Sequence, residues 1–182
     1  MTVRAVRAIV AVGAVIAVAV AAGRGEGRAI FNVDVFSFLQ GGGKDTLPYT
    51  LLGGVSGNVD NPPIEVSLLG GLGNSTVETV TLTVGADLDN TTGSGTVSFQ
   101  IFFATDSAST YTGTPLLNAS GPLAPGTITP ITGSATFADS LFNRQSLWVG
   151  IRLAVTTNPG PAVNGTMRLS ALDLRIVLRD RF

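Results

Sequence analysis

Apolar and polar residues alternate along much of the chain, most clearly in two neighbouring segments. The apolar face consists of Val80, Leu82 and Val84 in residues 76–86, and of Val97, Phe99, Ile101 and Phe103 in residues 96–104. A period of two residues predicts strands of a sheet that is buried on one side. Threonines occupy the other face of the first segment, where a β-branched polar residue fits well. The pair predicts a β-hairpin whose loop of about nine residues is longer than most hairpin loops.

The same alternation predicts further strands, separated by segments rich in Gly and Pro. They cover residues 29–39, 47–52, 64–69, 127–137, 146–156 and 166–179. Pro130 lies inside one of these strands and predicts an edge strand or a bulge there. A shift of the apolar phase between Leu169 and Leu172 predicts a bulge in the last strand. Residues 138–145 fit one helical turn with Asp139 as its N-cap, and an irregular loop fits equally well.

These strands and the 23 glycines indicate an all-β protein. Some connections are too long for a chain of simple hairpins. We therefore expect residues 29–182 to form one domain, a two-layer antiparallel β-sandwich with jelly-roll or Ig-like Greek-key links.

Residues 1–28 differ from the rest of the chain. A basic start, MTVRAVR, is followed by an apolar run from Ala8 to Ala22 and then by GRGEGR. A basic start, a short apolar helix and small residues at its end are typical of an export signal peptide. Two other interpretations are a retained membrane anchor and a structural N-terminal arm. The sequence thus predicts an exported protein, located outside the cell, at the cell surface or in the periplasm.

Charge is unevenly distributed, although the formal net charge is only −1. Residues 29–140 carry nine acidic residues against Lys44, whereas residues 141–182 carry six arginines against two aspartates. An acidic body with a basic C-terminal part can steer like subunits head to tail, or the two parts can neutralise each other within one fold. An acidic body without a basic stripe does not favour nucleic-acid binding.

The chain contains no Cys and no His, which restricts its chemistry. Disulfides, zinc sites of the usual type and an imidazole base are excluded. No GxSxG motif is present, and the single lysine, Lys44, lies in a Gly-rich segment. GGLGNS and QGGGKD lack the helix that a phosphate-binding loop requires. We therefore expect no enzymatic activity and no cofactor.

Two sets of residues raise the possibility of bound ions or sugars. Asp87, Asp89 and Asn90 place oxygen ligands at nearly alternate positions of the expected hairpin loop, as some calcium sites do, but the EF-hand pattern is incomplete. A polar turn explains them as well. Four N-glycosylation sequons, expected in loops, begin at Asn74, Asn90, Asn118 and Asn164.

The remaining candidate residues are aromatic or basic. Trp148 and Arg152 are out of phase with the apolar face of their strand, so an exposed Trp148 could stack on a sugar ring; Trp148 could equally pack beneath a long loop, as Tyr111 could. Arg175 and Arg179, with Arg181, lie in the C-terminal strand and could meet the acidic loop of another subunit. We expect a structural protein of a filament, layer or coat, whose partner is itself or another surface protein. A carbohydrate-binding or other ligand-binding module is the alternative.

Overall fold

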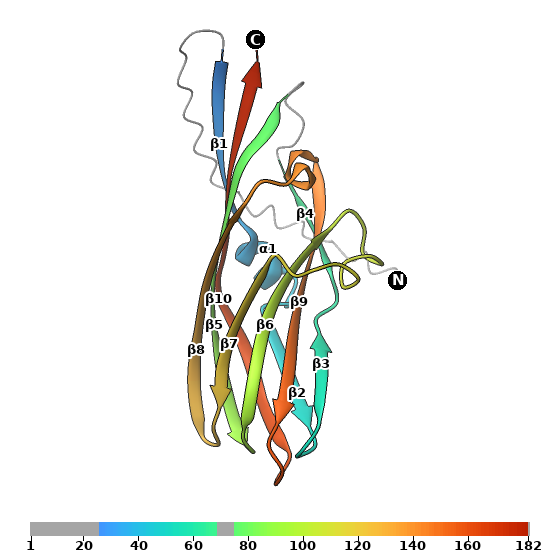
Figure 1. Ribbon diagram of the computed structural model, residues 1–182, viewed down its shortest axis with the longest axis vertical. Coiled ribbons are helices and arrows are strands. Elements are labelled where there is room, and N and C mark those ends of the chain that lie inside the picture. Colours follow the sequence, from blue (N-terminus) through green and yellow to red (C-terminus); the bar gives the residue numbers. More distant parts are fainter. Residues whose placement is uncertain (1–25, 69–74, 182) are drawn as a thin grey trace, which may run out of the picture.

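The computed structural model describes residues 26–68 and 75–181, and these residues form two stacked antiparallel sheets (Figure 1). The first sheet has the order β1-β10-β5-β8, with β2 also paired to β10; its strands are β1 (Glu26–Asp34), β2 (Thr46–Leu51), β5 (Thr76–Thr92), β8 (Thr127–Phe137) and β10 (Val163–Arg181). The second has the order β3-β9-β6-β7, with β4 also paired to β9; its strands are β3 (Ser56–Asp60), β4 (Ile64–Ser67), β6 (Gly95–Ala104), β7 (Leu117–Leu123) and β9 (Ser146–Thr157). The predicted two-layer sandwich is confirmed.

The core lies between the sheets and is built by the alternation seen in the sequence. Val80, Leu82 and Val84 of β5 are buried, as are Val97, Phe99 and Ile101 of β6. Leu147, Val149, Ile151, Leu153 and Val155 of β9 complete the inner face of the second sheet. Burying one face of each strand removes apolar area from water. Each Å² of buried apolar area contributes roughly 25 cal/mol of favourable free energy, so the two layers stabilise each other.

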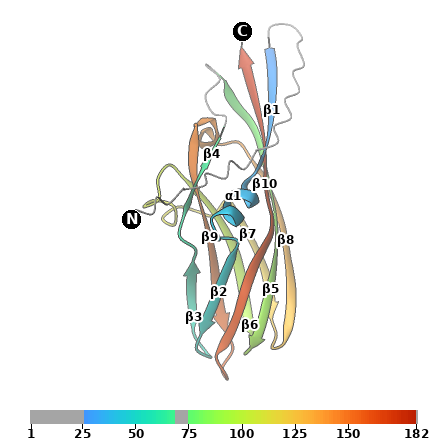
Figure 2. The same cartoon turned by 180° about the vertical axis from the view of Figure 1, so that it is seen from behind.

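Two edge strands are each split into two pieces. β1 and β2 pair with successive parts of β10, and β3 and β4 pair with successive parts of β9. Helix α1 (Val35–Gly41) separates β1 from β2 and covers one opening of the sandwich (Figure 2). Asn61, Pro62 and Pro63 separate β3 from β4. Among the described residues, no helix is both long and apolar enough to cross a bilayer.

The predicted hairpin of residues 76–104 was wrong. β5 continues to Thr92, only Gly93 and Ser94 follow before β6, and the two strands lie in different sheets. Asp87 and Asp89 are therefore exposed strand residues of β5, paired with Arg168 and Thr166 of β10. The hairpin loop in which calcium binding was considered is therefore part of strand β5.

Other expectations about secondary structure had mixed outcomes. Residues 29–39 are not one strand, because the chain turns into α1 after Asp34. The carboxylate of Asp34 caps this helix by accepting a hydrogen bond from the Ser37 amide at 3.0 Å. β3 lies in a segment expected to be a loop, and β7 was not predicted. Two predictions are confirmed: the register shift between Leu169 and Ala171, and Pro130 in an edge strand. Of the two alternatives for residues 138–145, the structure has the helical one, a short 3₁₀ helix η1 (Ser140–Asn143) capped by Asp139.

The sequons were expected in loops, and the structure corrects this for three of them. Asn90, Asn118 and Asn164 all lie in strands. Asn90 is 1% exposed and donates a hydrogen bond from Nδ2 to the Gly93 carbonyl at 2.9 Å, so it is inaccessible to a glycosyltransferase in the folded chain. Asn118 is exposed. The segment 1–25 and Asn74 lie outside the described residues.

Candidate functional site

The most developed polar site lies on the outer face of the second sheet. Trp148, Gly150 and Arg152 of β9 alternate with the buried apolar residues and therefore face away from the core, as the sequence predicted for Trp148 and Arg152. The loop of residues 105–116 between β6 and β7 folds back over this face. The loop can pack this closely only because Gly150 has no side chain: a Cβ atom there would lie 2.7 Å from Cζ of Tyr111.

Local hydrogen bonds fix the loop before it reaches β9. The Asp106 carboxylate accepts hydrogen bonds from the amide and the hydroxyl of Ser109, each at 2.8 Å. These bonds hold the pKa of Asp106 below its usual value. Thr110 donates from Oγ1 to the Asp106 carbonyl at 3.0 Å and is 1% exposed. This turn presents Tyr111 to the sheet.

Tyr111 joins the loop to two strands of the second sheet. Its ring packs edge-on against Phe102 of β6, with 5.3 Å between the ring centroids. Its hydroxyl donates toward the carbonyl oxygens of Ile151, at 3.0 Å, and of Asn61. Burial, with a smaller contribution from the Asp60 carboxylate, raises the pKa of Tyr111 to about 12. The phenol therefore stays neutral and acts as a hydrogen-bond donor at physiological pH.

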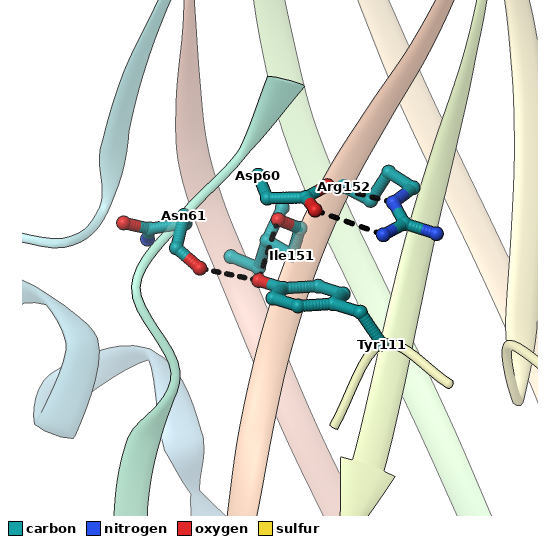
Figure 3. A network of polar contacts seen from close by, with 5 residues as sticks. All are labelled: Asp60, Asn61, Tyr111, Ile151 and Arg152. Atoms are coloured by element: carbon teal, nitrogen blue, oxygen red, sulfur yellow. Dashed lines mark hydrogen bonds and ion pairs between the residues drawn. The ribbon is translucent and has the colours of Figure 1, made fainter. Parts of the chain in front are cut away.

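Arg152 completes the site from the neighbouring position (Figure 3). Its Nε and Nη2 atoms bind the two carboxylate oxygens of Asp60 at 2.6 and 2.8 Å. The guanidinium also lies over the rings of Tyr111 and Phe102, at 4.9 and 5.2 Å from their centroids. The hydrogen bonds with Asp60 raise the pKa of Arg152 above its usual value. The two-pronged geometry and the stacking both suit arginine better than lysine.

Asn61 connects this site to the interrupted edge of the sheet. Its amide donates to the Ile151 carbonyl at 2.9 Å, and its Nδ2 donates to the Lys44 carbonyl at 2.6 Å. The side chain is 4% exposed, and Pro62 and Pro63 follow it. Asp60, Asn61, Tyr111 and Arg152, which we call the Arg152 network, thus tie β3, β9 and the 105–116 loop together. Because its groups bind one another, the network has a structural role: it holds these three segments together.

Trp148 lies on the same face but takes no part in the contacts of the Arg152 network described above. It is half-buried and is paired in register with Glu65 of β4 and Ala104 of β6. Glu65 accepts a hydrogen bond from the Ser146 hydroxyl at 2.7 Å. Tyr111 covers Gly150 between Trp148 and Arg152. The two candidates on β9 therefore do not form one joint binding surface.

Arg175 and Arg179 lie on the other sheet, in β10. Arg175 is exposed and is paired with Asn32 and Thr81; Arg179 is paired with Arg28 and Thr76. Next to them, Arg28 binds Glu78 at 2.7 Å. Asp87 and Asp89 lie on the same sheet, where Arg168 is the register partner of Asp87. Basic and acidic side chains thus share one face within a single subunit.

A pair of carboxylates on this face was missed by sequence reasoning. Asp34 of β1 and Asp173 of β10 are direct register partners. Burial, followed by the nearby Asp34 charge, raises the pKa of Asp173 above its usual value. Asp34 is already engaged as the cap of α1. Within 26–68 and 75–181, no group of three or more His, Cys, Asp or Glu side chains is arranged to hold a metal ion.

No family model and no curated protein sequence matches the chain. Solved structures of infectious bursal disease virus share a distant likeness. The Gt strain structure has a TM-score of 0.42 and 7% identity over 85% of this chain, and the T13 viral particle has a TM-score of 0.32 and 12% identity over 75%.

The chain spans less than two fifths of those viral chains, 38% and 36%. The structure itself defines the class: a two-layer antiparallel β-sandwich in which the Arg152 network holds two strands and a loop together.

Proposed function

We propose that the chain is an exported structural protein, a subunit of a filament, layer or coat that works by packing against copies of itself. Its sandwich would be a jelly roll. If β1 with β2 and β3 with β4 each count as one interrupted strand, each sheet has four strands. Most connections then pass from one sheet to the other, as the two Greek keys of a jelly roll require.

The observation that carries the proposal is an uncharged pair of edge strands. β8 ends the first sheet and β7 ends the second, on the same side of the sandwich (Figure 1). A groove of about 590 Å³ lies between them, lined by residues 116–120 and 130–135. Residues 107–138, which include both strands, contain no charged residue.

Edge strands of soluble proteins are normally protected from pairing by charges, prolines, bulges or a covering segment. β8 has eleven residues and is interrupted only by Pro130. On the opposite edges, β1, β3 and β4 carry the charged residues Glu26, Arg28, Asp34, Asp60 and Glu65, whereas the six-residue β2 is uncharged and contains Pro48. Apart from Pro130, the β8 edge carries none of these protective features, which supports strand pairing between subunits as the mode of assembly.

The chemistry of the described site supports the same proposal. The pKa of Tyr111 is about 12 and that of Arg152 is raised, so neither exchanges a proton near neutral pH. The sequence has no His or Cys to replace them. The proposal therefore assigns the chain no catalytic role and no cofactor. Export is supported by the basic start of the sequence and the apolar run from Ala8 to Ala22.

Lysine on the β8 edge tests the proposal. Thr132 is exposed on β8, and Thr83 is exposed on β5, which has partners on both sides. We expect Thr132→Lys to shift assemblies toward monomers in sedimentation velocity, because lysine protects an edge strand from pairing. The matched control, Thr83→Lys, leaves the distribution unchanged. Wild-type protein that stays monomeric at every concentration contradicts the proposal.

Carbohydrate binding is the second candidate, and the partly exposed ring of Trp148 favours it. Trp148 is the only tryptophan of the chain, so intrinsic tryptophan fluorescence reports on this position alone. A saturable change on titration with a polysaccharide would support this function. A flat response to a panel of polysaccharides would remove it.

A further inference from the structure

Four turns lie together at one end of the sandwich, opposite the end where the chain finishes (Figures 1 and 2). They consist of residues 52–55 between β2 and β3, 93–94 between β5 and β6, 124–126 between β7 and β8, and 158–162 between β9 and β10. We call these turns, together with Ile128 at the start of β8, the loop end. Its chemistry differs from that of the remaining surface.

Three of these turns, residues 52–55, 93–94 and 158–162, hold one another in place. The Gly54 amide donates to the Asn158 carbonyl at 3.0 Å, and the Asn158 amide donates to the Ser94 carbonyl at 2.8 Å. Gly53 and Gly160 are in such close contact that a Cβ atom at Gly53 would collide with the Gly160 carbonyl oxygen. A surface that is already ordered loses little conformational entropy on binding.

The loop end is apolar and uncharged. Among the described residues, the large hydrophobic side chains that stand exposed are Leu52 at 71%, Val55 at 43% and Ile128 at 65%, and all three lie here. No charged residue occurs in the segments that contain the turns, residues 46–59, 90–105, 107–138 and 153–167. Leu52 and Val55 follow β2 and Ile128 lies in β8, at opposite edges of the first sheet but at the same end of the sandwich. Exposed apolar residues confined to one end of a protein mark that end as an interaction surface.

A hollow of about 300 Å³ lies between three turns of the loop end, those of residues 93–94, 124–126 and 158–162. Pro125, Pro159 and Pro161 line it together with polar residues of the β5–β6 turn. The polar groups are already bound internally: Asn158 donates from Nδ2 to the Ser94 hydroxyl at 3.0 Å, and Thr92 donates from Oγ1 to the Ala162 carbonyl at 2.9 Å. Proline has no amide hydrogen to offer. The hollow therefore suits an aliphatic side chain better than a sugar.

We propose that the loop end docks against the loop end of a second copy, with Leu52 or Ile128 of each copy entering the hollow of the other. This inference rests on the proposed function, since it supplies a second contact between subunits. A projecting side chain and a hollow on the same surface are what a two-fold contact requires, because each copy then offers both parts. An uncharged surface also meets its own copy without like-charge repulsion.

A lipid bilayer fits the loop end less well. Surfaces that bind the membrane interface typically combine apolar residues with Trp or with Lys and Arg. The loop end has no aromatic and no basic residue.

Its contact area is small, and standard stable interfaces bury roughly 1,600 Å². The contact is therefore weak alone and becomes effective where β8 pairing already holds several copies together.

Aspartate in place of the projecting side chains tests the inference on the full chain. We expect Leu52→Asp and Ile128→Asp each to raise the dissociation constant for self-association about tenfold or more in sedimentation equilibrium. Thr96→Asp is the matched control, because Thr96 is exposed on β6 just outside the loop end. Leu52→Ser repeats the test without a new charge, and equal melting temperatures show that all variants are folded.

The outcomes separate this inference from the proposed function. Self-association that Thr132→Lys weakens but Leu52→Asp, Leu52→Ser and Ile128→Asp leave unchanged overturns the loop-end contact alone. A monomeric wild type overturns both proposals. Flotation of the wild type with phosphatidylcholine vesicles, lost in Leu52→Asp while self-association is unaffected, assigns the loop end to lipid and also overturns the inference.

Discussion

Tyr111 rests on Gly150 so closely that a Cβ atom at position 150 would lie 2.7 Å from Cζ of its ring. We predict that Gly150→Ala destabilises the protein by about 1–3 kcal/mol, the usual cost of forcing an extra methyl group into a packed contact. Urea unfolding measures this change. Gly113→Ala, in the same loop but with open space around it, is the control and leaves stability nearly unchanged. Equal effects of the two variants would mean that Tyr111 does not pack against Gly150 of β9.

Arg152 and Asp60 form the ion pair of the same network. Their side chains are 19% and 37% exposed, so the pair is partly shielded from water. We predict a coupling energy of about 1 kcal/mol in a double-mutant cycle with Arg152→Met and Asp60→Asn, at the upper end of the values for surface pairs. Arg152→Lys should not restore stability, because lysine lacks the two-pronged geometry. A coupling energy near zero would show that the ion pair does not contribute to the stability of the fold.

Tyr111 predicts a change of stability at alkaline pH. Its folded pKa of about 12 lies above the usual tyrosine value of 10.0, so the folded state holds its proton more tightly than the unfolded state does. Its contribution is complete below pH 10 and is lost as the pH rises toward 12. Tyr111→Phe should therefore flatten the fall in melting temperature between pH 10 and 12. Tyr49, whose pKa is also about 12, keeps part of that fall in the variant.

Asp173 predicts an effect at acidic pH. Burial and the neighbouring Asp34 raise its pKa, so protonation favours the folded state and the benefit is lost as the pH rises through the folded pKa. We expect Asp173→Asn to stabilise the protein slightly at pH 7, by up to about 0.5 kcal/mol for so exposed a group. The difference should vanish below pH 3.8, where both states are protonated. Thermal melts of the two proteins from pH 3 to 7 give the comparison.

The fold class was predictable because a period of two residues leaves a direct mark on the sequence. The pairing of strands was not, since Val80 and Val97 show only that each strand buries one face and not which sheet contains it. β5 and β6 therefore looked like a hairpin. Helix α1 was hidden for a related reason: VDVFSFL continues the alternation, while the capping Asp34 and the apolar pair Val35 and Leu39 at i and i+4 carried the helical signal.

The candidate site was only partly visible in the sequence. Trp148 and Arg152 were found because they are out of phase with the apolar face of β9. Asp60 was missed as the partner of Arg152, because it lies 92 residues away in a segment taken for a loop. Asn61-Pro62-Pro63 was the available signal for the interrupted edge strand. The meeting of distant segments at Gly150 depends on the three-dimensional arrangement, which no local pattern contains.

Disulfide trapping tests self-packing through β8 most directly, and the absence of native cysteine makes it clean. Two β8 strands that pair antiparallel across a two-fold axis bring one residue close to its own copy, within the 4.4–6.8 Å Cα separation of a disulfide. Under mild oxidation, at least one of Thr132→Cys, Ser134→Cys and Thr136→Cys should give a covalent dimer, and Thr83→Cys should not. Assembled protein in which none of the three β8 variants is linked would contradict two-fold edge pairing centred on residues 132–136 of β8.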